Sequence, residues 1–107
     1  MLRSFNRVII VGNLARNPKF QTLSNGQSLA DMTLAVNDRR QIQDGQLTEA
    51  TFVNITCWGR LAELVDKKCL AGSRVLVEGR LGMDTLQVGG TRSHKLRVIV
   101  ETIEFLD

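Results

Sequence analysis

Short runs in which apolar and polar residues alternate recur along the chain, and turn-forming residues separate them. Successive side chains of a strand point to opposite faces, so such runs are typical of β-strands. The pattern predicts five strands, within residues 6–14, 28–37, 51–60, 73–82 and 94–106. A single segment has apolar residues at helical spacing instead, and Leu61, Leu64, Val65 and Cys69 predict a short amphipathic helix before Gly72.

Turn signals separate the predicted strands. Asn25 and Gly26 predict a tight hairpin, and Gly89 with Gly90 predicts a second one. Pro18 is expected to lie in a loop that also contains Phe20, and residues 38–50 form a polar segment expected to be a long arm or loop. The apolar side of the last strand changes parity, which predicts a bulge or bend near Glu101.

The order of these elements is three strands, one helix and two strands. A chain of 107 residues is long enough for one domain with a real core, so residues 1–107 are predicted to form a single all-β domain. Five strands with one short helix between the third and the fourth is the arrangement of the five-stranded Greek-key barrel called the OB-fold. The outer face and loops of this fold bind oligonucleotides or oligosaccharides.

The third predicted strand, TFVNITCWGR, has an unusual outer face. Its inner face is aliphatic, whereas two aromatic rings share the opposite face with polar side chains: Phe52, Asn54, Thr56 and Trp58. An exposed ring can stack on any nucleobase, and each such contact contributes about 1–3 kcal/mol. The pattern therefore favours a nucleic-acid platform, and the alternative is that one or both rings lie under a loop or in a subunit interface.

Charge supports the same hypothesis. The formal net charge is +3 and the pI is near 9.3, a mild tilt towards polyanions. Basic residues flank the predicted platform and are expected to contact phosphates: Arg7, Arg39, Arg40, Arg74, Arg80, Arg92, Lys95 and Arg97.

Other chemistry has little support in the sequence. There is no nucleophile elbow, phosphate-binding glycine loop or cluster of metal ligands, so we expect neither an enzyme nor a metal or other cofactor. Cys57 and Cys69 are not spaced as a metal pair and are expected to be small buried residues, and His94 is expected at the surface. The sequence has no membrane-spanning run and no signal peptide, which predicts a cytoplasmic, nucleoid-associated location.

Three stretches resemble the bacterial single-stranded DNA-binding protein family: NRVIIVGNLARNPKF, SNGQSLADMTLAVN and TFVNITCWGRLAELVDKKCLAGSRVLVEGRL. They cover essentially the whole chain, and their motifs recur together in that family. The resemblance implies an OB-fold homotetramer that wraps single-stranded DNA with little sequence preference and protects it in replication, recombination and repair. It also implies that Phe52 and Trp58 are stacking residues and that Arg7 contacts phosphate.

The chain departs from the family pattern at two aromatic positions. Arg40 occupies one at the start of the long arm, and Leu86 occupies the tryptophan position in the last hairpin. Two stacking contacts are therefore expected to be missing, with partial compensation by charge from Arg39, Arg40, Arg92 and Lys95. Family members typically continue into a flexible linker with an acidic tip that recruits replication and repair proteins, and this tip is not among the 107 residues. A truncated chain and a tail-less member both fit.

Two alternatives stay open at the level of the sequence. One is a tail-less primosomal replication protein, a dimeric OB relative that acts mainly through protein partners. The other is a protein-interaction module in which Phe52 and Trp58 lie inside an interface. Preference for DNA over RNA is also open, because nothing in the sequence obviously reads a 2′-hydroxyl.

Overall fold

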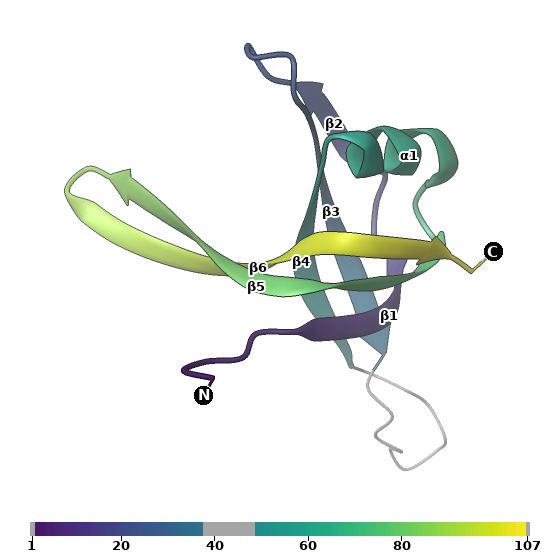
Figure 1. Ribbon diagram of the computed structural model, residues 1–107, viewed down its shortest axis with the longest axis horizontal. Coiled ribbons are helices and arrows are strands. Elements are labelled where there is room, and N and C mark those ends of the chain that lie inside the picture. Colours follow the sequence, from purple (N-terminus) through teal and green to yellow (C-terminus); the bar gives the residue numbers. More distant parts are fainter. Residues whose placement is uncertain (1, 38–48, 107) are drawn as a thin grey trace.

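The computed structural model describes residues 2–37 and 49–106 and has the shape of a barrel with a projecting hairpin (Figure 1). In chain order its elements are β1 (Val8–Leu14), β2 (Lys19–Thr22), β3 (Ser28–Asn37), β4 (Ala50–Trp58), α1 (Arg60–Lys68), β5 (Arg74–Val88) and β6 (Thr91–Phe105). The sheet has the order β1-β5-β6-β4-β3-β2, and an additional pairing of β1 with β3 closes five of the strands into a ring. The predicted OB-fold is confirmed, with its helix between the third and fourth strands of the ring.

The edge strand β2 corrects one expectation. Residues 19–22, expected in the loop after Pro18, form an antiparallel pair with β3 that joins Lys19 to Asp31 and Phe20 to Ala30. The turn between these strands is the predicted one at Asn25 and Gly26, where Gly26 has a φ of 86°. Because Phe20 lies opposite the buried Ala30, its ring points to the helix side of the sheet and away from the outer face.

The barrel interior is filled by the aliphatic faces of the ring strands. Its fully buried side chains include Leu34, Ile55, Val75, Val77 and Val98. Along β3 and β4 every second side chain points inward and is buried, as the sequence predicts for Met32, Leu34, Ile55 and Cys57. Thr33 and Thr56, on the outer face, are buried as well. On the outer face of β1, by contrast, the apolar side chains of Ile9 and Val11 are exposed.

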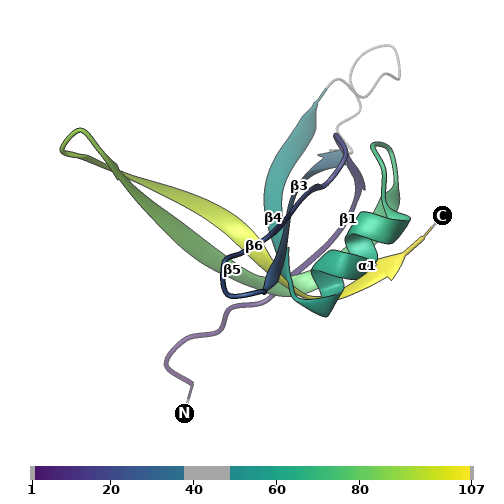
Figure 2. The ribbon, with the colours of Figure 1, turned by 90° about the horizontal axis from the view of Figure 1, so that it is seen from above.

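The helix α1 closes one end of the barrel beside β3 and β4 (Figure 2). Ala62 and Val65 are its fully buried residues, as the amphipathic pattern requires. The chain enters the helix through Gly59, whose φ of 61° is unfavourable for other residues, and the Gly59 amide donates to the carbonyl of Ser28 at 2.8 Å. The strand that carries the two aromatic rings therefore leads directly into the helix that covers the core.

Strands β5 and β6 form a long hairpin whose outer part projects beyond the barrel (Figures 1 and 2). Their pairing runs from Val75 opposite Phe105 to Val88 opposite Thr91, and the turn contains Gly89 and Gly90, both with positive φ. Residues 83–88, which lie outside the five strands predicted from the sequence, are thus part of a strand. The register shifts by one residue where Gly79 pairs with Val100, which leaves Glu101 as the extra residue of a bulge at the predicted position.

Candidate nucleic-acid interface

The outer faces of β3 and β4 place polar residues in matched pairs. Thr33 lies opposite Asn54, and Asp31 lies opposite Thr56. Directly opposed residues of an antiparallel pair project to the same face, so the four side chains form one polar surface. Phe52 follows on the same face of β4, two residues before Asn54.

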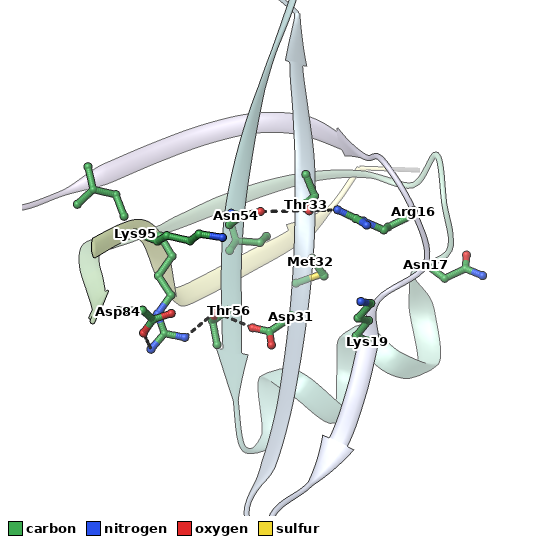
Figure 3. A pocket seen from close by; sticks show the side chains of 13 residues that line it. Arg16, Asn17, Lys19, Asp31, Met32, Thr33, Asn54, Thr56, Asp84 and Lys95 are labelled. Atoms are coloured by element: carbon green, nitrogen blue, oxygen red, sulfur yellow. Dashed lines mark hydrogen bonds and ion pairs between the residues drawn. The ribbon is translucent and has the colours of Figure 1, made fainter. Parts of the chain in front are cut away.

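Hydrogen bonds connect these polar residues to one another (Figure 3). The Arg16 guanidinium donates to Oγ1 of Thr33 at 3.2 Å, and the Thr33 hydroxyl donates to Oδ1 of Asn54 at 3.3 Å. The Thr56 hydroxyl donates to Oδ1 of Asp31 at 2.9 Å. The orientation of each polar group on the platform is thus set by a neighbour rather than by solvent.

Arg97 joins the projecting hairpin to this surface. Its Nη1 donates to Oγ1 of Thr56 at 3.0 Å, and its Nη2 lies 3.1 Å from Oδ1 of Asp84. The side chain is only 22% exposed, and its Nε is buried without a hydrogen-bond partner among the described residues. Arg97 therefore reaches the platform as a largely covered cation and not as a solvated surface charge.

A groove of about 420 Å³ lies over these residues and separates two groups of cations. Figure 3 shows Arg16 and Lys19 on the β2 side of the platform and Lys95 on the side of the hairpin. The polar residues that line it are Arg16, Asn17, Lys19, Asp31, Thr33, Asn54, Thr56, Asp84, Lys95 and Arg97. A polyanion lying in the groove would meet positive charge on both walls.

The two aromatic rings flank the groove along β4. Phe52 is 65% exposed although it belongs to a regular strand, and Trp58 at the other end of β4 is half-buried. At about 3.3 Å per residue, their α-carbons lie about 20 Å apart along the strand. Phe52 thus presents the open ring expected of a stacking residue, while Trp58 presents only part of its surface.

The remaining basic residues predicted from the sequence are spread over other parts of the barrel. Arg7 forms an ion pair with Glu78, and Arg80 lies 3.7 Å from Glu101. Arg74 lines a second hollow, between β1 and β3, together with Asn13.

Of the other residues singled out from the sequence, two lie on the outer part of the hairpin and two lie outside the residues that the structure describes. Arg92 and Leu86 are exposed on the outer part of the hairpin, and Leu86 shares the face of Asp84 and Lys95. Arg39 and Arg40 lie outside the described residues. The structure thus brings Asn54, Thr56, Lys95 and Arg97 together in the groove and does not bring Arg7, Arg74, Arg80 or Arg92 there.

Several groove residues were not singled out from the sequence. Arg16, Lys19 and Asp84 are single charged residues in segments assigned to loops or turns, and nothing local indicates that they face β4. Asp31 and Thr33 belong to a strand with an evident polar face, so their position on the outer face could be predicted. Their partners could not, since pairing depends on the register of β3 and β4.

Both cysteines are buried and free, as predicted. Burial raises the pKa of the Cys57 thiol to about 12, with smaller contributions from Cys69 and Asp31. Burial also raises the pKa of the Cys69 thiol. Both groups are therefore held as neutral thiols at physiological pH, which is the unreactive form.

We expect neither thiol to react with iodoacetamide near pH 8 while the protein is folded, since the thiolate is the nucleophile and neither sulfur is accessible. In guanidinium chloride both should react, and mass spectrometry would detect two added groups. Modification of the native protein at the rate of the denatured protein would contradict the buried, neutral state.

The part of the chain that the structure describes contains neither a cluster of metal ligands nor a membrane-spanning helix. Within residues 2–37 and 49–106, no group of three or more His, Cys, Asp or Glu side chains could hold a metal ion. No helix in that part of the chain is both long and apolar enough to cross a membrane. His94 is exposed, as expected, and its Nδ1 lies 3.1 Å from Oγ1 of Thr85.

Comparison with known proteins identifies relatives over nearly the whole chain. Residues 5–106 match the family described as the Single-strand binding protein family. A single-stranded DNA-binding protein of Wolinella succinogenes is 41% identical in an alignment over 106 residues that covers 96% of this chain and 65% of that protein. Single-stranded DNA-binding protein B of Bacillus subtilis is 35% identical over 104 residues, covering 96% of this chain and 91% of that protein. The chain thus spans slightly less than two thirds of the Wolinella protein and nearly all of the Bacillus protein.

Proposed function

Because the chain belongs to the Single-strand binding protein family, we propose that it binds single-stranded DNA without sequence preference. The observation that carries this proposal is the exposed Phe52 ring beside a groove with cations on both walls. A ring and a charged wall recognise the two features that every nucleotide has, a flat base and a phosphate. The proposed activity is binding and protection, and it involves no catalytic step.

The proposed contacts divide between bases and phosphates. Phe52 stacks on one base, and Trp58 offers part of its ring to another. Asn54 lies on the surface between them and meets the sugar or the base edge. Thr56 is buried and contributes by accepting a hydrogen bond from Arg97. Phosphates are expected at the cations, with the strongest support for those that line the groove: Arg16, Lys19, Lys95 and Arg97.

The basic residues away from the groove have weaker support. Arg7, Arg74, Arg80 and Arg92 remain proposed contacts on a DNA strand long enough to continue around the barrel, as do Arg39 and Arg40. Arg7 and Arg80 already have carboxylate partners, Glu78 and Glu101, so a phosphate there would compete with an existing ion pair. Exposed ion pairs are weak, which makes such competition feasible.

We propose a role in DNA replication, recombination and repair, in the cytoplasm and in association with the nucleoid. The support is the family of the chain and the names of its relatives. Replication and repair proteins are proposed partners if the full-length protein carries an acidic C-terminal tail.

A homo-oligomer is also part of the proposal. Ile9 and Val11 expose aliphatic side chains next to one another on the outer face of β1. Apolar side chains of a regular strand are stabilised when a second copy covers them. A tetramer is the proposed state, and sedimentation equilibrium distinguishes it from the dimer expected of a primosomal replication protein.

The central test is a fluorescence-anisotropy titration of labelled oligo-dT and of a duplex with the protein. We expect oligo-dT to bind much more tightly, and its affinity to fall steeply between about 50 and 200 mM salt, since bound cations are released from DNA. Trp58 is the only tryptophan, so its quenching by oligo-dT reports contact near that end of β4. Equal affinity for duplex and single strand would refute the proposed function.

A further inference from the structure

The contact between Arg97 and Asp84 places a carboxylate where a DNA phosphate would bind. We propose that Arg97, anchored on Thr56, forms a phosphate subsite together with Lys95, and that the Asp84 carboxylate occupies this subsite in the free protein, so that DNA must displace Asp84 to enter it. This inference rests on the proposed function and identifies a side chain of the same groove that limits affinity for the ligand.

The chemistry of the pair supports the substitution. A guanidinium presents its N–H groups in a planar fork that fits a carboxylate or a phosphate in the same way. Nη2 of Arg97 is 3.1 Å from Oδ1 of Asp84, in a groove that also contains the Lys95 side chain. Lys95 lies directly across the hairpin from Asp84, so one bound anion could be shared by the two cations.

The geometry keeps Arg97 in place when its carboxylate partner leaves. Nη1 donates to Oγ1 of Thr56 at 3.0 Å, and the Thr56 hydroxyl is itself fixed by donating to Asp31. Thr56 is almost fully buried on β4, which is paired with β3 and β6 in the barrel wall. Arg97 is therefore anchored at one end of its fork, and only the end that faces Asp84 has to exchange its partner.

The Asp84 side chain is more exposed than the Arg97 side chain, as it must be if a phosphate is to replace the carboxylate. The Asp84 side chain is 46% exposed, whereas the Arg97 side chain is 22% exposed. A half-exposed carboxylate can turn to solvent and be hydrated there, because only the cation is enclosed by the groove. The subsite can thus change its anion without unfolding the hairpin.

The salt dependence of DNA binding should reveal whether Asp84 occupies the subsite in the free protein. In the wild type, a phosphate that replaces Asp84 leaves a bare carboxylate close to the DNA, so Arg97 neutralises no additional charge overall. With Asp84→Asn, Arg97 has no internal anion and neutralises one phosphate outright. Each neutralised phosphate of single-stranded DNA adds about 0.7 to the slope of log K against log salt.

The test compares oligo-dT binding by the wild type, Asp84→Asn and Glu104→Gln across a salt series. Glu104 is an exposed carboxylate near the other end of β6, so its replacement matches the change in net charge without touching the groove. We expect Asp84→Asn to bind about fivefold more tightly at low salt and to steepen the slope by about 0.7. Glu104→Gln should leave the slope unchanged.

A second comparison assigns the effect to Arg97. The gain from Asp84→Asn should vanish in a background that already carries Arg97→Gln. If Asp84→Asn binds as the wild type does, or binds more weakly with an unchanged slope, Asp84 only positions Arg97 and the proposal is overturned. An equal gain from Glu104→Gln would also overturn it, because net charge alone would then explain the effect. If the wild type itself fails to prefer oligo-dT, the proposed function fails instead.

Discussion

Replacing Phe52 by alanine should weaken oligo-dT binding by about 1–3 kcal/mol, which corresponds to about five- to 150-fold in the dissociation constant. The ring is 65% exposed on a regular strand, so the protein gains little from it in the absence of a ligand. The expected loss is the stacking energy of one base. Anisotropy titrations of wild type and variant across a salt series measure it directly.

The salt dependence separates stacking from charge in this experiment. Phe52→Ala removes no cation, so the slope of log K against log salt should match that of the wild type. Phe5→Ala is a suitable control, since Phe5 is 75% exposed but lies before β1 and away from the groove. Wild-type affinity in Phe52→Ala would mean that the ring serves an interface or the architecture, and the binding energy would then have to come from the cations.

The platform could be predicted because its signal is local. The alternation of TFVNITCWGR places Phe52, Asn54 and Thr56 on one side, and a strand of this length keeps that parity in any fold. The hairpin turns at Asn25–Gly26 and Gly89–Gly90 and the bulge at Glu101 were predictable for the same reason. Each depends on residues within a few positions of one another.

The groove could not be predicted because its contacts are distant in sequence. Arg97 and Thr56 are 41 residues apart, and their hydrogen bond depends on how the hairpin crosses β4. A basic residue at position 97 is an evident candidate for phosphate binding. Only the structure reveals that the guanidinium of Arg97 already contacts Asp84 and Thr56.

Strand β2 was not predicted from the sequence for a different reason. Its four residues, Lys19–Thr22, are all exposed, so no apolar alternation distinguishes them from a loop. They adopt strand geometry because the turn at Asn25–Gly26 returns the chain alongside them as β3. The same pairing puts Lys19 opposite Asp31, which is how an edge strand contributes a cation to the groove.

Placement of the hairpin over β4 depends on a close approach at Gly79. A β-carbon at this position would lie 1.9 Å from the carbonyl oxygen of Ile99, far inside contact distance. That carbonyl belongs to the backbone of β6 at the bulge, so it cannot turn aside as a side chain would. The residue after Glu78 therefore has to be glycine for β5 and β6 to pair in this register.

Gly79→Ala should lower the free energy of unfolding by about 1–3 kcal/mol, because the strands must separate locally to admit the methyl group. Replacing a glycine also lowers the conformational entropy of the unfolded chain, which stabilises the folded state by only about 0.4–1 kcal/mol. The steric cost is therefore the larger of the two effects. Urea denaturation measures the net loss.

Gly82→Ala is the matched control. A β-carbon at position 82 would lie 2.5 Å from the terminal carbon of the Ile99 side chain, and this side chain can rotate away. A smaller loss in Gly82→Ala with a large one in Gly79→Ala identifies the backbone contact as the cause, whereas equal losses would contradict a special cost of the backbone contact at Gly79. Since Arg97 contacts Thr56 from the hairpin in this register, Gly79→Ala should also weaken oligo-dT binding under conditions in which it remains folded.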